Sequence, residues 1–169
     1  MKLYTIGYGN VEGKTHQAKR DNFIALLRYI EFATRTKDTK GLIIVDVRKE
    51  GCGSRNGKWA AWGAVGMGHT VRMIHGGVYL TVPGLANDPR MGFRKYRGWL
   101  EEAIISGSPV TVSAREGFHT IIDLLKTSEL PVILLCAERV GLGEKGTLCH
   151  RVIIAEMVKE RTGCEVIHL

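Results

Sequence analysis

Two short segments built only from apolar residues constrain the fold of this chain more than any other feature. Residues 42–45 read Leu-Ile-Ile-Val, and residues 132–136 read Val-Ile-Leu-Leu-Cys. A strand with one solvated face alternates apolar and polar residues, whereas a parallel strand covered by helices on both faces is apolar throughout. Both segments are therefore predicted to be buried strands of a parallel sheet.

The rest of the chain alternates between strand-like and helix-like segments. Further strands are predicted at residues 3–6, 78–82 and 165–169. Apolar residues at helical spacing predict helices at residues 22–32, 93–105, 113–125 and 150–161, with Asp21 as the first N-cap and Gly163 as the last stop. Strands that alternate with helices indicate an α/β fold. We expect one domain over residues 1–169, with a mainly parallel open sheet of about five strands and helices on both faces, in Rossmann-like or flavodoxin-like layering.

The stretch from residue 49 to residue 77 is the least regular part of the chain. It holds eight of the 21 glycines and no long periodic segment. An irregular loop of this length in a compact domain is usually functional or mobile. The sequence therefore predicts a Gly-rich loop here, without indicating its role.

Length and composition remove several classes of protein. A chain of 169 residues buries roughly 70% of its unfolded surface, so it needs no metal or disulfide to fold. The four cysteines form no C-x-x-C pair, which argues against structural zinc, and no cofactor is indicated. No apolar run approaches the roughly 20 residues that cross a bilayer, and no signal-peptide pattern opens the chain. We therefore expect a cytoplasmic protein without a membrane partner; its oligomeric state stays open.

Basic residues are concentrated in the first part of the chain. Residues 1–100 carry 17 Lys and Arg against 7 Asp and Glu, and residues 101–169 carry 7 against 10, within a net charge of +7. A basic surface favours anionic partners, such as a phosphate-bearing small molecule or nucleic acid. A solvated surface without a partner accounts for the same charges equally well, because no tract of Lys and Arg gathers them.

Polar residues directly follow three of the predicted strands, at residues 7–10, 46–55 and 136–151. Right-handed crossovers place the C-terminal ends of parallel strands at one edge of the sheet, and ligands of open α/β sheets bind at that edge. We therefore expect these three exits to lie together and to form the ligand site.

The exit after the second predicted strand contains charged side chains that suit an anionic ligand. Asp46 ends the buried strand, and Arg48, two residues later, shares its face, so the two side chains can pair. In a functional role Asp46 is a general base and Arg48 an anion clamp; in a structural role the pair only holds the loop, and the sequence leaves both open. Ser54 and Arg55 lie beside glycines that let backbone N–H groups approach a phosphate or carboxylate.

The exit before the last predicted helix is the most informative. Cys136 ends a strand, and Glu138 lies two residues later as a candidate acid or base. Cys149, His150 and Arg151 are expected in the first helical turn, where N–H groups and the helix dipole favour an anion. The same field lowers the pKa of a thiol, so Cys149 is a candidate nucleophile. Of the two roles, anion binding by His150 and Arg151 is the favoured one.

Taken in order, these motifs resemble the domain of unknown function 488 family. The resemblance is carried by residues 5–10 (Thr-Ile-Gly-Tyr-Gly-Asn), 45–48 (Val-Asp-Val-Arg), 54–55 (Ser-Arg), 134–138 (Leu-Leu-Cys-Ala-Glu), 149–151 (Cys-His-Arg) and 166–169 (Val-Ile-His-Leu), so it spans essentially the whole chain. Phe93 and Tyr96 are similar to the family's F-x-x-Y segment. The resemblance implies a compact α/β fold and a shared site that also includes Gly7, Tyr8 and Asn10. It implies no reaction, because the activity of that family is unassigned.

The chain also departs from this pattern. Family members often carry a proline between the Asp-x-Arg and Ser-Arg motifs, where residues 49–53 here read Lys-Glu-Gly-Cys-Gly. Residues 56–77 are unusual as well, which leaves the substrate open. A fainter similarity to rhodanese-type domains involves residues 46–48 and Cys136, but the Arg that those enzymes carry five residues after the Cys is Gly141 here.

Three functional hypotheses follow. The leading one is an enzyme acting on a phosphate-bearing ligand, namely a nucleotide, a nucleic-acid base or a nucleic-acid end, with Asp46 or Glu138 as acid or base. The second is thiol-based, rhodanese-like chemistry at Cys149 or Cys136. The third is a non-catalytic nucleotide- or nucleic-acid-binding module.

Overall fold

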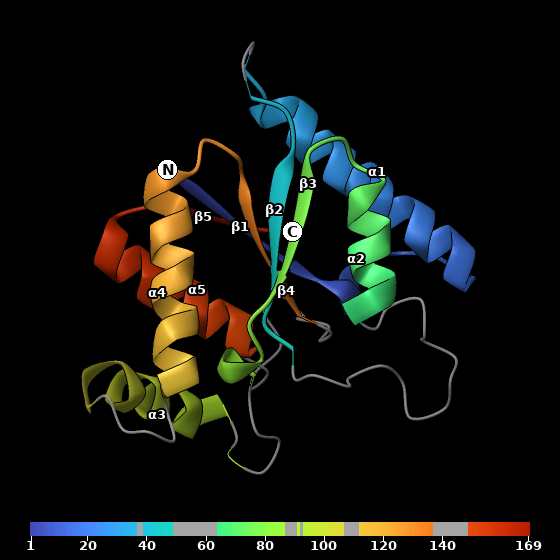
Figure 1. Ribbon diagram of the computed structural model, residues 1–169. Helices are drawn as coiled ribbons and strands as arrows, with labels where there is room; N and C mark the ends of the chain where they lie inside the picture. Colours follow the sequence, from blue (N-terminus) through green and yellow to red (C-terminus); the bar gives the residue numbers. More distant parts are fainter. Residues whose placement is uncertain (37–38, 49–63, 87–90, 92, 107–111, 137–148) are drawn as a thin grey trace.

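The computed structural model describes residues 1–36, 39–48, 64–86, 91, 93–106, 112–136 and 149–169 (Figure 1). The described strands form one sheet in the order β3-β2-β4-β1-β5, and every neighbouring pair is parallel. They are β1 (Lys2–Gly7), β2 (Leu42–Asp46), β3 (Gly77–Thr81), β4 (Val132–Cys136) and β5 (Glu165–His168). The predicted parallel sheet of five strands is confirmed.

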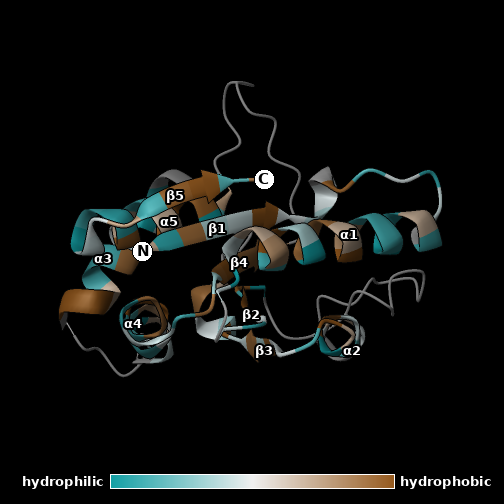
Figure 2. Cartoon of the chain, turned by 90° about the horizontal axis from the view of Figure 1, so that it is seen from above, coloured by the Kyte–Doolittle hydropathy of each residue, from teal (hydrophilic) through white to brown (hydrophobic). Residues whose placement is uncertain are grey.

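Helices cover both faces of the sheet, as predicted. One face packs against α1 (His16–Thr34) and α2 (Ala64–Arg72), and the other against α3 (Phe93–Ser106), α4 (Val112–Thr127) and α5 (His150–Thr162). The sheet therefore lies between two helical layers (Figure 2). Two short 3-10 helices, η1 (Tyr8–Asn10) and η3 (Pro83–Leu85), follow β1 and β3.

The two wholly apolar segments become neighbouring strands in the interior of the sheet. In β2, Ile43 and Val45 belong to the core under α3–α5, whereas Leu42 and Ile44 belong to the core under α1 and α2. β4 divides its side chains between the two cores in the same way. Because successive side chains of a strand point to opposite faces, a strand buried on both faces has to be apolar at every position.

The first helix begins earlier than the sequence predicted. Thr15, not Asp21, is the N-cap of α1, and its side chain accepts a hydrogen bond from the backbone N–H of Ala18 at 3.1 Å. Asp21 lies inside the helix, is exposed and accepts a hydrogen bond from Gln17. The early turns carry few apolar residues, so the spacing pattern begins only at Phe23.

The stretch 49–77 was predicted as a loop, and part of this prediction is wrong because α2 lies within it. Gly66 and Gly68 hide the helix in the sequence, since glycine is a poor helix former. A Cβ atom at Gly68 would lie 3.2 Å from the ring of Tyr79, so a larger residue would crowd the contact between α2 and β3. Residues 49–63 lie outside the described part of the chain.

Candidate active site

The C-terminal ends of β1, β2 and β4 meet at one edge of the sheet. In the strand register Gly7 lies beside Cys136, and Asp46 lies beside Leu135. Tyr8 and Asn10 follow Gly7 directly in η1. The expectation that the polar exits begin at a common edge is therefore confirmed for the described residues.

Two buried thiols form the centre of the candidate site. The Sγ atoms of Cys136, the last residue of β4, and Cys149, the N-cap of α5, lie 2.8 Å apart. Cys136 is 0% exposed and Cys149 is 2% exposed. The Cys149 side chain does not cap its own helix, so its sulfur is directed at Cys136 instead.

Arg151 brings a positive charge to these sulfurs. Its guanidinium is buried, and its Nη1 donates to Cys136 Sγ at 2.8 Å and to Cys149 Sγ at 3.7 Å. Burial by itself raises the pKa of Cys136, but the hydrogen bond from Cys149 and the charges of Arg151 and His150 outweigh it and lower the pKa to about 6. A buried cation is stable beside an opposite charge, and Cys136 supplies one when its thiol is ionised.

His150 lies between the thiols and the end of β2. Its Nε2 is 3.2 Å from the Val47 carbonyl oxygen, and its Nδ1 is 3.8 Å from Cys149 Sγ. A carbonyl only accepts hydrogen bonds, so Nε2 carries a proton, and Nδ1 faces the Cys149 thiol. The ring also packs edge-on against Tyr96, with centroids 6.0 Å apart.

Asp46 and Arg48 form the ion pair that their spacing predicted. Arg48 Nε donates to both carboxylate oxygens of Asp46, at 2.8 and 2.9 Å, and Nη2 donates to the second of them. The hydroxyl of Tyr79 also donates to Asp46, at 2.5 Å. Both members of the pair are buried. Burial lowers the pKa of Arg48, but its bond to Asp46 outweighs this effect and raises it, so the guanidinium stays charged.

Tyr79 belongs to this cluster, although the sequence analysis did not single it out. It lies on β3, beside Ile44 of β2, and it reaches Asp46 only through the length of its side chain. Its sequence context, Val-Tyr-Leu in a half-buried strand, looks like ordinary strand composition. The pairing of β3 with β2 was the information needed to find it.

Tyr8 and Tyr96 support the site from two sides. Burial raises the pKa of Tyr8, and the nearby charge of Arg48 partly offsets this effect, which puts Tyr8 beside the Asp46–Arg48 pair. Tyr96 is fully buried in α3, and its hydroxyl donates to the Leu85 carbonyl oxygen at 2.6 Å. Tyr96 therefore holds the ring of His150 against the core.

The remaining predicted site residues are not placed. Ser54, Arg55 and Glu138 lie outside the described residues, and nothing is described of the Asn10 side chain. Among the described residues no group of three or more His, Cys, Asp and Glu side chains is arranged to hold a metal ion. Within the same residues, no helix has both the length and the apolar character needed to span a membrane.

Comparison with known proteins adds no relative to this description. No protein-family model matches the chain, and no curated protein or solved structure is significantly similar to it. The resemblance to the domain of unknown function 488 family therefore stays a prediction, and the site is interpreted from its own geometry.

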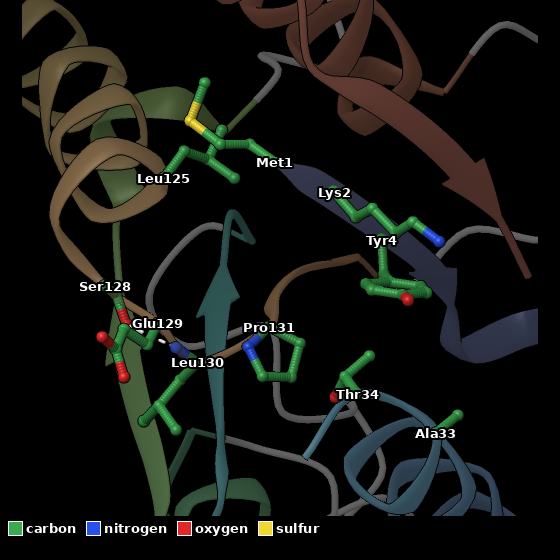
Figure 3. Close-up of a pocket in the computed structure, with 10 residues that line it drawn as sticks. All are labelled: Met1, Lys2, Tyr4, Ala33, Thr34, Leu125, Ser128, Glu129, Leu130 and Pro131. Atoms are coloured by element: carbon green, nitrogen blue, oxygen red, sulfur yellow. Dashed lines mark hydrogen bonds between the residues drawn. The ribbon is translucent and has the colours of Figure 1, made fainter. Parts of the chain in front are cut away.

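An open cleft of about 310 Å³ lies at the opposite, N-terminal edge of the sheet (Figure 3). It is bordered by Lys2 and Tyr4 of β1, Thr34 at the end of α1, and Glu129 and Pro131 before β4. Lys2 approaches Glu165 at 3.8 Å, and both side chains are more than half exposed. The buried, charge-coupled groups Cys136, Arg151 and Asp46 lie at the other edge of the sheet, so that edge is taken as the candidate active site.

Proposed function

We propose that this protein is a thiol-dependent enzyme and that Cys136 is its nucleophile. One observation supports this most strongly: a buried guanidinium and a second thiol both lie 2.8 Å from the Cys136 sulfur, at the carboxyl edge of a parallel sheet. Thiolates, not thiols, are the nucleophilic form, and an adjacent cation and a helix N-terminus both favour the thiolate. Arg151 and the start of α5 supply these two features.

The neighbouring residues have separate roles in this proposal. Arg151 holds the Cys136 thiolate by charge and hydrogen bonding. Cys149 donates its S–H to that thiolate, and Nδ1 of His150 faces the Cys149 sulfur at 3.8 Å. Asp46 and Arg48 keep the adjacent strand exit in place, because their charges are directed at each other and at Tyr79. Thiols stay reduced in a reducing compartment, so a cytoplasmic location is part of the proposal.

The ionisation of Cys136 tests this function without requiring a substrate. Thiolates absorb at about 240 nm, so a pH titration of the folded protein reports them even when they are buried. We expect an absorbance step with a midpoint near pH 6 in the wild type. Cys136→Ser should abolish the step.

Cys164→Ser is the matched control, because Cys164 is equally buried but lies at the far end of α5. It should leave the step unchanged, and circular dichroism should show that all variants are folded across the range. A wild-type protein whose first thiol ionises only above about pH 8, the range of an ordinary cysteine, would contradict the proposal.

We propose binding of a phosphate-bearing ligand, a nucleotide or a nucleic-acid base or end, as the second candidate function. It is supported by the meeting of three polar strand exits at one edge, next to the first turn of α5. It ranks second because Arg48 and Arg151, two cations expected to bind phosphate, donate to Asp46 and Cys136 instead. If the ligand is bound but not converted, the protein is a non-catalytic binding module.

Calorimetric titration with a nucleoside triphosphate and a short oligonucleotide tests this second function. If Arg55 contacts phosphate, Arg55→Ala should weaken binding by about tenfold, the effect of losing roughly 1.4 kcal/mol. Arg35→Ala removes an exposed arginine after α1 and should leave the affinity unchanged. Equal binding by wild type and Arg55→Ala would exclude a phosphate contact by Arg55. No binding by either protein would exclude the second function.

A further inference from the structure

We infer that Cys136 and Cys149 form a reversible dithiol–disulfide couple that reduces small hydroperoxides. Because Cys136 is the nucleophile of the proposed function, the couple rests on that function and adds its substrate class. The two Sγ atoms are 2.8 Å apart, and a disulfide needs about 2.04 Å, so the bond forms through a small movement of the side chains.

The pair is separated along the chain by the segment between β4 and α5, and the fold brings it together. Cys136 is fixed at the end of a strand that is buried throughout, and Cys149 is fixed at the N-cap of a helix whose first residues are also buried. Once one of two such thiols is oxidised to a sulfenic acid, the other, held in contact with it, reacts with it faster than a distant thiol does. A resolving cysteine is therefore in place before any oxidant arrives.

The first step is attack of the Cys136 thiolate on the peroxide. A bond forms between Cys136 Sγ and the terminal oxygen of ROOH, and the O–O bond breaks. Cys136 becomes a sulfenic acid, and the alkoxide or hydroxide that leaves takes the proton of the Cys149 thiol. Arg151 stabilises the negative charge as it moves, because Nη1 contacts both sulfurs.

The second step forms the disulfide. Cys149, now a thiolate, attacks Cys136 Sγ; the S–S bond forms, the S–O bond breaks, and hydroxide leaves as water with a proton from solvent. In sum, one thiol, one thiolate, one proton and ROOH give a disulfide, ROH and water. Two electrons pass from the sulfurs to the peroxide, and a small external dithiol returns them by thiol–disulfide exchange.

The burial of the site favours a small oxidant. Cys136 is 0% exposed and Cys149 2% exposed, and a disulfide substrate has to present its sulfur in line with the attacking thiolate. A hydroperoxide offers its terminal oxygen on a group the size of a water molecule. Small hydroperoxides are therefore the substrate class; burial excludes large disulfide substrates, such as those of folded proteins, more strongly than the small dithiol that reduces the couple.

Mass spectrometry after one equivalent of hydrogen peroxide tests the couple in the full chain. We expect the reduced wild type to lose two thiols and about 2 Da, and dithiothreitol to restore both. Trypsin cleaves after Arg139 and Lys145, so Cys136 and Cys149 fall on different peptides that the disulfide links. In Cys149→Ser, the oxidation of Cys136 should stop at a sulfenic acid, which adds about 16 Da to the protein. Dimedone should react with this sulfenic acid and so identify it.

Cys164→Ser and Cys52→Ser are the matched controls and should form the same linkage as the wild type. With dithiothreitol present, wild type should consume peroxide continuously, and Cys149→Ser should lose at least tenfold in that rate. Survival of both thiols, over-oxidation of Cys136 in the wild type, or a linkage through Cys52 or Cys164 would overturn the couple.

The two thiol proposals fail in different ways. If Cys136 titrates near pH 6 but forms no bond to Cys149, the proposed couple is contradicted and the proposed nucleophile stands. If the disulfide forms although Cys136 titrates as an ordinary thiol, the proposed nucleophile is contradicted and the two cysteines are a redox-sensitive pair only.

Discussion

Asp46→Ala is expected to lower the free energy of unfolding by about 3–5 kcal/mol, because it leaves the buried charge of Arg48 without its partner. The side chains of Arg48 and Asp46 are 7% and 3% exposed, so water does not replace the lost carboxylate. The Tyr79 hydroxyl loses its acceptor in the same variant, which adds to the cost. Urea denaturation followed by circular dichroism measures the change.

Arg97→Ala is the matched control for this prediction. Arg97 also makes carboxylate pairs, with Glu101 at 2.9 Å and Glu160 at 2.8 Å, but its side chain is 39% exposed. Exposed pairs contribute about 0–1 kcal/mol, so this variant should lose at most that amount. Equal losses in the two variants would mean that water reaches the Asp46–Arg48 pair.

A second pair of variants separates charge from packing. Asp46→Asn keeps the shape and one acceptor but removes the negative charge, and it should recover only a small part of the loss. Replacing both residues, as Asp46→Ala with Arg48→Met, should be more stable than Asp46→Ala alone, because no unpaired charge stays buried. A double variant that is less stable than the single one would contradict the role of the ion pair.

The parts of this fold that the sequence predicted are those in which a single local rule applies. β2 and β4 are apolar at every position because both faces are covered, and a strand with a solvated face does not produce this pattern. Gly163 ends α5 with a left-handed φ of 69°, a conformation for which glycine is the usual residue. The pairing of Asp46 with Arg48 followed from their spacing on one face of an extended chain.

The misjudged parts depend on contacts that no local rule contains. Gly68 weakens the helical pattern of α2 because the ring of Tyr79 packs closely over it, and Tyr79 belongs to a different element. The start of α1 was missed because its early turns have few apolar residues, and Thr15 as a cap is a weaker signal than Phe23 and its successors.

The candidate site shows the same division. The first turn of α5 was predicted, and with it the nearness of Cys149, His150 and Arg151 to a helix N-terminus. The partner of Arg151 was not predicted. The sequence suggested an external phosphate, whereas the guanidinium donates a hydrogen bond to Cys136 at the end of β4. Only the packing of α5 against β4 reveals that the arginine and both thiols belong to one cluster.

Arg151→Met is the variant that should change the chemistry of this cluster most. Methionine keeps much of the buried volume but removes the positive charge, so the effect of burial is less fully offset and the pKa of Cys136 rises. A pKa that rises from about 6 toward the free-thiol value of about 8.5 lowers the thiolate fraction at pH 7, by up to about thirtyfold. Absorbance titration at about 240 nm and the rate of peroxide-driven disulfide formation should both report this loss.

Arg161→Met is the matched control, because it makes the same change at the exposed far end of α5 and should leave both readouts as in the wild type. Arg151→Lys keeps the charge but not the guanidinium fork, so it should give an intermediate pKa. An unchanged Cys136 pKa in Arg151→Met would show that Cys149 and His150 alone hold the thiolate.

The pH dependence of stability gives an independent measure of the same interaction. A thiol whose pKa is lower in the folded than in the unfolded protein binds fewer protons when folded, so folding gains stability as the pH rises between the two values. From about pH 6, the folded pKa of Cys136, to about pH 8.5, the unfolded value, the ionisation of Cys136 should make the folded protein more stable as the pH rises. Below pH 6 this contribution is lost. Arg151→Met should reduce the slope while Arg161→Met keeps it, because the guanidinium is one of the groups that lower the pKa of Cys136.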